Sequence, residues 1–93
     1  MITSLDLLNR LKVEKQLDSN RQVAAFLGIS HSTVNRVGKT YFWNDDLACE
    51  IADTLGLDVD LVLLAIIAER SKNERAIGAF KRLEDAANDK KIA

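Results

Sequence analysis

Apolar residues recur along the chain at the three- and four-residue spacing of a helix, and no segment alternates apolar and polar positions as a strand does. Short polar segments lie between the apolar stretches, and they contain residues that typically start or stop helices. The pattern therefore predicts an all-α fold of about five short helices followed by a C-terminal helical extension. We expect a domain of residues 1–70 and an extension of residues 71–93.

Two capping signals delimit the first two helices. The first helix is expected to begin at Thr3 or Ser4 and to end near Gln16. Its predicted core-facing residues are Leu5, Leu8 and Leu11, with Leu7 as a further candidate. The segment from Ser19 to Gln22 has the S-x-x-Q form of a capping box, in which the two side chains satisfy backbone N–H groups at a helix start. A second helix is therefore expected to begin there and to end near Leu27.

Glycines and polar caps mark the remaining boundaries. Gly28 fits the position just past a helix end, where the backbone is often left-handed. Two residues later, Ser30 can cap a third helix that runs from His31 to about Val37. The later helices are expected to begin after the caps Asn44, Asp58 and Ser71, and to end at Gly56, near Arg70 and near Ala87.

The second and third helices form the most informative pair, because only the residues from Gly28 to Ser30 separate them. So short a connection forces a sharp angle between the helices. The residues expected to pack inside this angle are Val23, Ala24, Leu27, Ile29, Val34 and Val37. The outer face of the third helix then carries polar and basic side chains without an acid, namely His31, Ser32, Thr33, Asn35, Arg36 and Lys39.

This arrangement resembles the helix-turn-helix domains of the Cro and Xre type, the phage-repressor-like regulators that bind DNA. The matching residues are Asn20, Gln22, the pair Val23 and Ala24, the triplet Leu27 to Ile29, Ser30, and the spacing of Val34 and Val37. The resemblance extends from about Leu5 to Leu64. It does not cover the loop after the third helix, where family members often carry an acidic residue and a proline and this chain has neither.

The resemblance implies a lambda-repressor-like fold and a role for each polar residue of the pair. The third helix would lie in the major groove of double-stranded DNA, and His31, Ser32 and Arg36 match the positions that read bases. The residues expected to contact the DNA backbone or to support the base-reading side chains are Asn20, Gln22, Thr33, Asn35, Lys39 and Arg10. His31 and Arg36 are alternatively ordinary surface residues, and Gln22 has a structural role in the capping box.

The loop from Tyr41 to Trp43 has two interpretations. The simpler one is a hydrophobic plug that fixes this loop to the core. In the other, the edge of Tyr41 or Trp43 contacts the DNA backbone.

Charged residues are distributed unevenly, although the 93 residues carry a formal net charge of only -1. Residues 9–42 contain six basic side chains and two acidic ones, a local balance of +4. Residues 44–70 contain seven acids and one arginine, a balance of -6. Because phosphate contacts dominate nucleic-acid affinity, a local basic surface matters more than the total charge. An ordinary solvated surface explains the same distribution equally well.

A second copy of the chain is the expected partner on DNA. One unit of this kind reads about half a site, and specific affinity usually requires the contact area of two modules. The segment from Leu61 to Ala68 is apolar nearly all round. The predicted dimerisation residues are Leu61, Leu64, Ile67, Ile77, Phe80 and Leu83. The alternative is that Ile77, Phe80 and Leu83 fold back onto the core of their own chain.

An enzyme, a bound metal and a cofactor are not expected. The chain has one histidine, one cysteine and no glycine-rich phosphate loop, so it offers neither a nucleophile–base pair nor a set of metal ligands. No signal peptide follows Met1, and the apolar segment from Leu61 is too short to span a bilayer. The sequence therefore predicts a cytoplasmic protein that does not contact a membrane.

A protein-interaction module is the alternative function. A domain of the same fold would then bind a phage or host protein, such as a regulator or polymerase, as an antirepressor-like or antitoxin-like adaptor does. The acidic residues 44–70 and the apolar C-terminal segment are the features that favour it. Within the DNA-binding reading, we expect a small phage or prophage repressor that acts as a homodimer.

Overall fold

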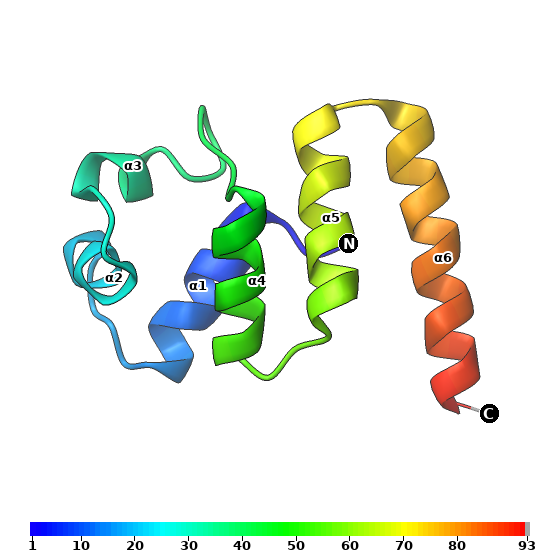
Figure 1. Cartoon of the computed structure of the whole chain (residues 1–93), viewed down its shortest axis with the longest axis horizontal. Helices are drawn as coiled ribbons and strands as arrows, with labels where there is room; N and C mark the ends of the chain where they lie inside the picture. Colours follow the sequence, from blue (N-terminus) through cyan, green and yellow to red (C-terminus); the bar gives the residue numbers. More distant parts are fainter. Residues whose placement is uncertain (93) are drawn as a thin grey trace.

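The computed structural model describes residues 1–92, and in this part of the chain it contains six helices and no β-strand (Figure 1). The helices are α1 (Ser4–Glu14), α2 (Asn20–Leu27), α3 (His31–Asn35), α4 (Asp45–Thr54), α5 (Val59–Ser71) and α6 (Glu74–Ile92). The predicted all-α fold is confirmed, and its helix order is consistent with a helix-turn-helix domain followed by an added helix. Ala93, the last residue of the predicted extension, lies outside the described residues.

The helices are arranged as a row with the short helices at one end (Figure 1). α4, α5 and α6 lie side by side in the row, and each contacts its neighbour. α1 lies behind α4, while α2 and α3 pack against each other at the left of the view. The helix-turn-helix pair is therefore at the opposite end of the molecule from α6.

Most helix starts follow the predicted caps. A side-chain oxygen of the cap accepts a hydrogen bond from the backbone N–H three residues later at Ser19, Ser30, Asn44 and Asp58. Such caps satisfy N–H groups that have no partner inside the helix. The start of α6 differs from the prediction, because Asn73 and not Ser71 receives the hydrogen bonds from the N–H groups of Arg75 and Ala76, at 2.9 and 3.1 Å.

Several helix ends differ from their predicted positions. α1 ends two residues early, at Glu14, and α6 continues to Ile92, beyond the predicted Ala87. α3 ends at Asn35, not at Val37, because the carbonyl of Arg36 accepts hydrogen bonds from three N–H groups of the following turn. The chain therefore leaves α3 in a tight turn instead of a further helical turn.

The main core lies between α1, α2, α3, α4 and the inner side of α5. Its fully buried residues of largest volume are Trp43, Leu7, Leu11, Ile51, Ile66, Val23 and Val34. The prediction for Leu5 was wrong, because this side chain is 47% exposed and Leu7 takes the buried position. Ser4, Leu7, Leu8 and Leu11 share the inner face of α1 at helical spacing, and Leu5 falls outside it.

A second, smaller cluster joins α5 to α6. Phe80 of α6 packs against Ala65 and Ala68 of α5, and the partly buried residues around them are Met1, Ile2, Leu61 and Ile77. Phe80 is only 4% exposed. The structure therefore corrects the assignment of Phe80 to a dimer interface: its ring is buried within its own chain, where the small alanines of α5 leave room for it. Ile77 and Leu61 belong to the same cluster and are half-buried.

Candidate nucleic-acid interface

The connection between α2 and α3 is as tight as the sequence predicts. Gly28 follows α2 with φ 70° and ψ 34°, a left-handed conformation that penalises a Cβ. Its N–H and that of Ile29 return to the carbonyls at the end of α2. Ser30 then caps α3 by accepting a hydrogen bond from the N–H of Thr33 at 3.4 Å.

Packing inside the angle between the two helices determines which face of α3 points outward. The buried residues are Val23, Ala24 and Leu27 from α2, with Val34 and Val37 from α3 and the turn after it. Ile29 is partly buried against them. The predicted inner face of the pair is therefore confirmed, and the polar residues of α3 must face away from it.

The predicted base-reading residues lie on this outward face. Ser32 and Arg36 are exposed and lie one helical turn apart, while His31 is half-buried at the start of α3. The Nε of Arg36 donates to the carbonyl of Ser32 at 3.3 Å, and the hydroxyls of Ser30 and Ser32 are 2.7 Å apart. Within the described residues the two terminal guanidinium nitrogens of Arg36 make no hydrogen bond, so they remain available to a partner.

The supporting residues connect α2 to α3. The Asn20 amide nitrogen donates to the Asn35 amide oxygen at 2.9 Å, which links the first residue of α2 to the last residue of α3. The Asn20 oxygen is buried and has no partner within the part of the chain described. Asn35 is thus held by a neighbouring side chain, which suits a residue that positions the face more than one that reaches a base.

Gln22 makes only half of the expected capping box. Its N–H donates to the Ser19 hydroxyl at 3.2 Å, as predicted. Its side-chain oxygen, however, accepts from the N–H of Asp18 at 2.6 Å and not from that of Ser19. The Gln22 side chain therefore ties down the turn that precedes α2, although it remains exposed.

The remaining predicted contacts are divided between two places. Lys39 is exposed in the turn after α3, and Thr33 is half-buried on α3 itself. Arg10 is elsewhere: it lines one cavity of about 440 Å³ with Val13 and Leu55, and a second beside Leu61 and Glu84. The structure does not bring Arg10 together with the polar face of α3, because none of the residues that line these cavities with it belongs to α2 or α3.

The loop after α3 is fixed to the core by a tryptophan. Trp43 is fully buried, and its indole N–H donates to the carbonyl of Ser4 at 3.0 Å. The Tyr41 ring packs edge-on against Trp43, with ring centres 5.9 Å apart. Trp43 is therefore a plug, and it has no edge free to contact DNA. Tyr41 and Phe42 are half-buried, and the Lys72 ammonium lies 5.5 Å from the centre of the Phe42 ring.

A polar network that the sequence did not suggest supports this plug; it is buried at Ser4 and exposed at the Arg70–Asp45 ion pair. The Ser4 hydroxyl accepts a hydrogen bond from the backbone N–H of Trp43 at 3.2 Å. It donates a hydrogen bond to the Glu69 carboxylate at 2.6 Å. Arg70 donates to the Trp43 carbonyl at 3.2 Å and forms an ion pair with Asp45 at 2.6 Å. These residues are far apart in the sequence, so no local pattern could have grouped them.

The surface around α3 differs in charge from the rest of the protein. No acidic residue occurs from Ser19 to Asn44, a range that includes Arg21, Arg36 and Lys39. By contrast, α4 exposes Asp46, Glu50 and Asp53 along its outer side. The region of α2, α3 and the following turn is therefore basic without an acid, which suits a polyanion.

Comparison of this chain with protein-family models, with curated proteins and with solved structures gave no match in any of the three. The resemblance to the Cro and Xre domains therefore stays a prediction from the sequence. Within residues 1–88, whose side chains the structure describes, no group of three or more histidine, cysteine, aspartate or glutamate side chains is placed to hold a metal ion. None of the helices described has both the length and the apolar composition needed to cross a membrane.

Proposed function

We propose that this protein is a sequence-specific double-stranded DNA-binding regulator of transcription, of the small phage or prophage repressor type, that acts in the cytoplasm. One observation carries the proposal: α3 is held at the end of a tight helix-turn-helix, and its outward face is polar, basic and free of acids. Helices presented in this way enter the major groove with their first turns at the base edges.

The chemistry of this face supports a division of roles. The terminal nitrogens of Arg36 can donate two hydrogen bonds to O6 and N7 of a guanine, while its Nε stays with the Ser32 carbonyl. The Ser32 hydroxyl and the His31 ring can each donate to or accept from a base edge. We expect contacts from Asn20, Asn35 and Lys39 to phosphates to set the position of the helix.

A change at Arg36 tests the proposal most directly. Arg36→Ala is expected to weaken binding to the cognate site by about 1 to 3 kcal/mol and to leave the fold intact, because the side chain is exposed. Selection from a random DNA pool identifies the site, and fluorescence anisotropy then compares the affinities of variant and parent for it at one salt concentration.

Lys15→Ala is a matched control, since it removes one positive charge from an exposed position outside the helix-turn-helix. It should reduce affinity for cognate and random duplex equally and only slightly. Equal affinity of Arg36→Ala and the parent for the selected site would remove Arg36 from the proposed base-reading role.

The adaptor function is a second candidate, because α4 and α5 expose acidic and apolar residues away from α3. The two functions differ in salt dependence. Binding to random duplex DNA that falls steeply as salt rises supports the DNA-binding proposal. Failure to bind any DNA at low salt, together with co-purification of a phage or host protein, would support the adaptor instead.

A further inference from the structure

Three sides of α5 are occupied within the chain, and the fourth is not. Val62 and Ile66 point into the main core, and Ala65 and Ala68 contact α6. Glu69 lies against the start of α1, where its carboxylate accepts from the Ser4 N–H at 3.0 Å. The opposite side carries Leu64 and Ile67, which are 45% and 37% exposed, and the exposed Asp60 one helical turn before Leu64. This side of α5 is therefore uncovered, and it is apolar except at Asp60 near the start of the helix.

α6 exposes an apolar residue next to this uncovered side. Phe80 points from α6 to α5, and Leu83 and Glu84 follow it by three and four residues. Seen along the helix axis, Leu83 lies about 60° to one side of Phe80, and Glu84 lies about 40° to the other side. Glu84 lies 3.5 Å from the amino group of Met1, on the side of the N-terminus. Leu83, which is 61% exposed, must therefore lie on the other side, with Leu64 and Ile67.

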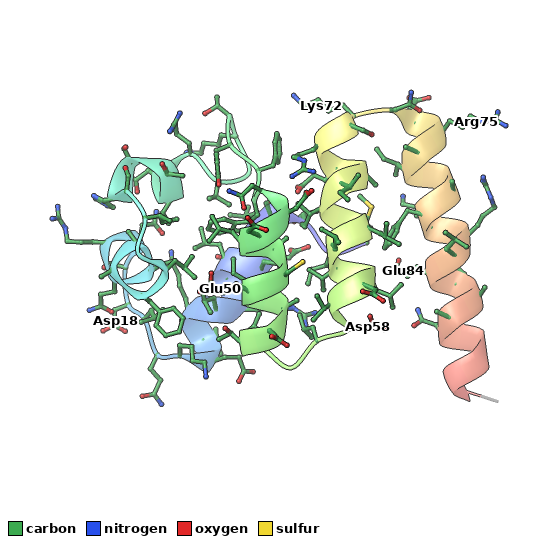
Figure 2. All side chains as sticks on the ribbon, in the orientation of Figure 1. Asp18, Glu50, Asp58, Lys72, Arg75 and Glu84 are labelled. Carbon is green, nitrogen blue, oxygen red and sulfur yellow. The ribbon has the colours of Figure 1, made fainter. Side chains whose placement is uncertain are left out.

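Charges of opposite sign flank these apolar residues. On α4, Asp46, Glu50 and Asp53 recur at helical spacing along the exposed side. On α6, Arg75 and Arg82 are exposed and two helical turns apart. Glu50 and Arg75 lie at opposite edges of the row of helices in Figure 2. Across the row, the surface is thus acidic on α4, apolar on α5 apart from Asp60, apolar on the near side of α6, and basic on the far side of α6.

We propose that this surface binds a second copy of the chain. We name it the three-helix face and define it by Glu50, Asp53, Leu64, Ile67, Leu83 and Arg82. The twofold axis runs parallel to α5. This inference deepens the proposed function and rests on it, because a DNA-binding regulator of this type needs a pair of chains. The interface itself requires no DNA.

Charge complementarity selects the direction of the axis. In a face-to-face dimer with a twofold axis along α5, the α4 edge of one chain lies opposite the α6 edge of the other, so acids meet arginines at both edges. A twofold axis that lies in the interface but runs perpendicular to the helices would instead place α4 of one chain against α4 of the other. Like charges would then lie opposite each other, which is unfavourable. Both arrangements bury Leu64 and Ile67, so only the charges distinguish them. The parallel axis brings Asp60 of the two chains opposite each other at one end of α5. That is one like-charged pair, against acid–arginine contacts at both edges, so the charges still favour this axis.

The size of the face fits a reversible dimer. The 13 residues of α5 give a length of about 20 Å. Three helices spaced 8 to 10 Å apart give a width of about 25 Å, and hence an outline of roughly 500 Å². Stable interfaces bury about 800 Å² per partner, so this face is small for a permanent dimer. We therefore expect monomer and dimer to exchange with protein concentration.

Two charge-reversal variants test the interface without DNA. Variant A carries Glu50→Lys and Asp53→Lys, and variant B carries Arg75→Glu and Arg82→Glu. All four side chains are exposed, so both variants should fold. In the proposed dimer, each variant alone has like charges at both edges, and self-association should fall by about tenfold or more. A one-to-one mixture of A and B has opposite charges at both edges, and it should dimerise as the parent does.

Sedimentation velocity across a concentration series measures the parent, each variant and the mixture, and circular dichroism checks that each chain is folded. Asp18→Lys is the control, because it reverses an exposed charge at the far end of the molecule (Figure 2). A parent that stays monomeric up to about 100 µM, or an A and B mixture that stays monomeric, would overturn the interface. A heterodimer of variant A with the parent, and not with B, would indicate the perpendicular axis and would also overturn it.

The outcome separates this inference from the proposed function. A chain that dimerises through the three-helix face but binds no DNA would retain the interface and refute the regulator. A chain that binds its DNA site with no self-association would retain the regulator and refute the interface.

Discussion

The outer face of α3 and the three-helix face are both exposed, but they are built differently. The α3 face belongs to a helix of five residues that cannot hold its own conformation, and it depends on Gly28, on the α2 contacts and on the Trp43 loop. The three-helix face lies on helices of 10, 13 and 19 residues. A change in the core should therefore disturb the α3 face before the three-helix face.

The chemistry of the two faces differs in the same way. The α3 face carries hydrogen-bonding groups and arginine without a carboxylate, which suits a polyanion. The three-helix face carries leucine and isoleucine between an acidic and a basic edge, which suits a protein surface. One small domain can thus offer one surface to a polyanion and another to a protein, provided that its core holds both surfaces in place.

The largest expected effect is on the support of the α3 face. Trp43→Ala removes a fully buried ring and its hydrogen bond to Ser4, and should lower the free energy of unfolding by about 3 to 5 kcal/mol. Urea denaturation followed by circular dichroism measures the loss. Phe42→Ala, at the half-buried neighbouring position, should cost less. Equal losses for the two variants would contradict the role of Trp43 as the plug.

An intermediate effect is expected at the helix-turn-helix itself. Gly28→Ala places a Cβ at φ 70°, where an L-residue is strained, and should cost about 1 to 2 kcal/mol although the space beside it is open. Gly78→Ala is the matched control, because Gly78 lies inside α6 and its Cβ would meet only the Arg82 guanidinium at 3.5 Å. That change should stabilise the protein by about 0.5 to 1 kcal/mol through helix propensity. In thermal unfolding, Gly28→Ala should lower the melting temperature and Gly78→Ala should raise it. Shifts of the same sign would contradict the strain at Gly28.

The smallest effect on folding is expected on the three-helix face. Leu64→Ser should change the stability of the monomer by no more than about 0.5 kcal/mol, because the side chain is already 45% exposed. The same change should weaken self-association measurably. Denaturation at low protein concentration isolates the monomer, since dimerisation adds concentration-dependent stability. A large loss of monomer stability would show that Leu64 belongs to the core and not to an interface.

Short-range features of the fold could be predicted because they depend on neighbouring residues. The caps at Ser19, Ser30, Asn44 and Asp58 act within three residues, and the left-handed turn at Gly28 depends on one. The cap of α6 was placed at the wrong residue, because Ser71 and Asn73 are both good caps and the sequence does not rank them. Leu5 and Leu7 were confused for a related reason, since both fit an apolar stripe until the direction of the core is known.

The candidate site was predictable to a similar extent. The inner and outer faces of the helix-turn-helix follow from apolar spacing, so Ser32, Asn35 and Arg36 were placed on the exposed side correctly. Arg10 was grouped with them as one of the six basic residues of the stretch 9–42, and the structure places it apart from α3. The hydrogen bond from Asn20 to Asn35 joins two residues 15 positions apart, and no pattern in either helix indicates it.

Local sequence was enough for the helices, for the caps at Ser19, Ser30, Asn44 and Asp58, and for the sharp turn at Gly28, because these depend on backbone preferences and contacts within a few residues. The inward turn of Phe80, the uncovered side shared by Leu64, Ile67 and Leu83, and the hold of Ser4 and Glu69 on the Trp43 loop emerge only from the packed helices. Burial is a property of the packed chain. An apolar residue at helical spacing fits a core or an interface equally well until its neighbours are in place.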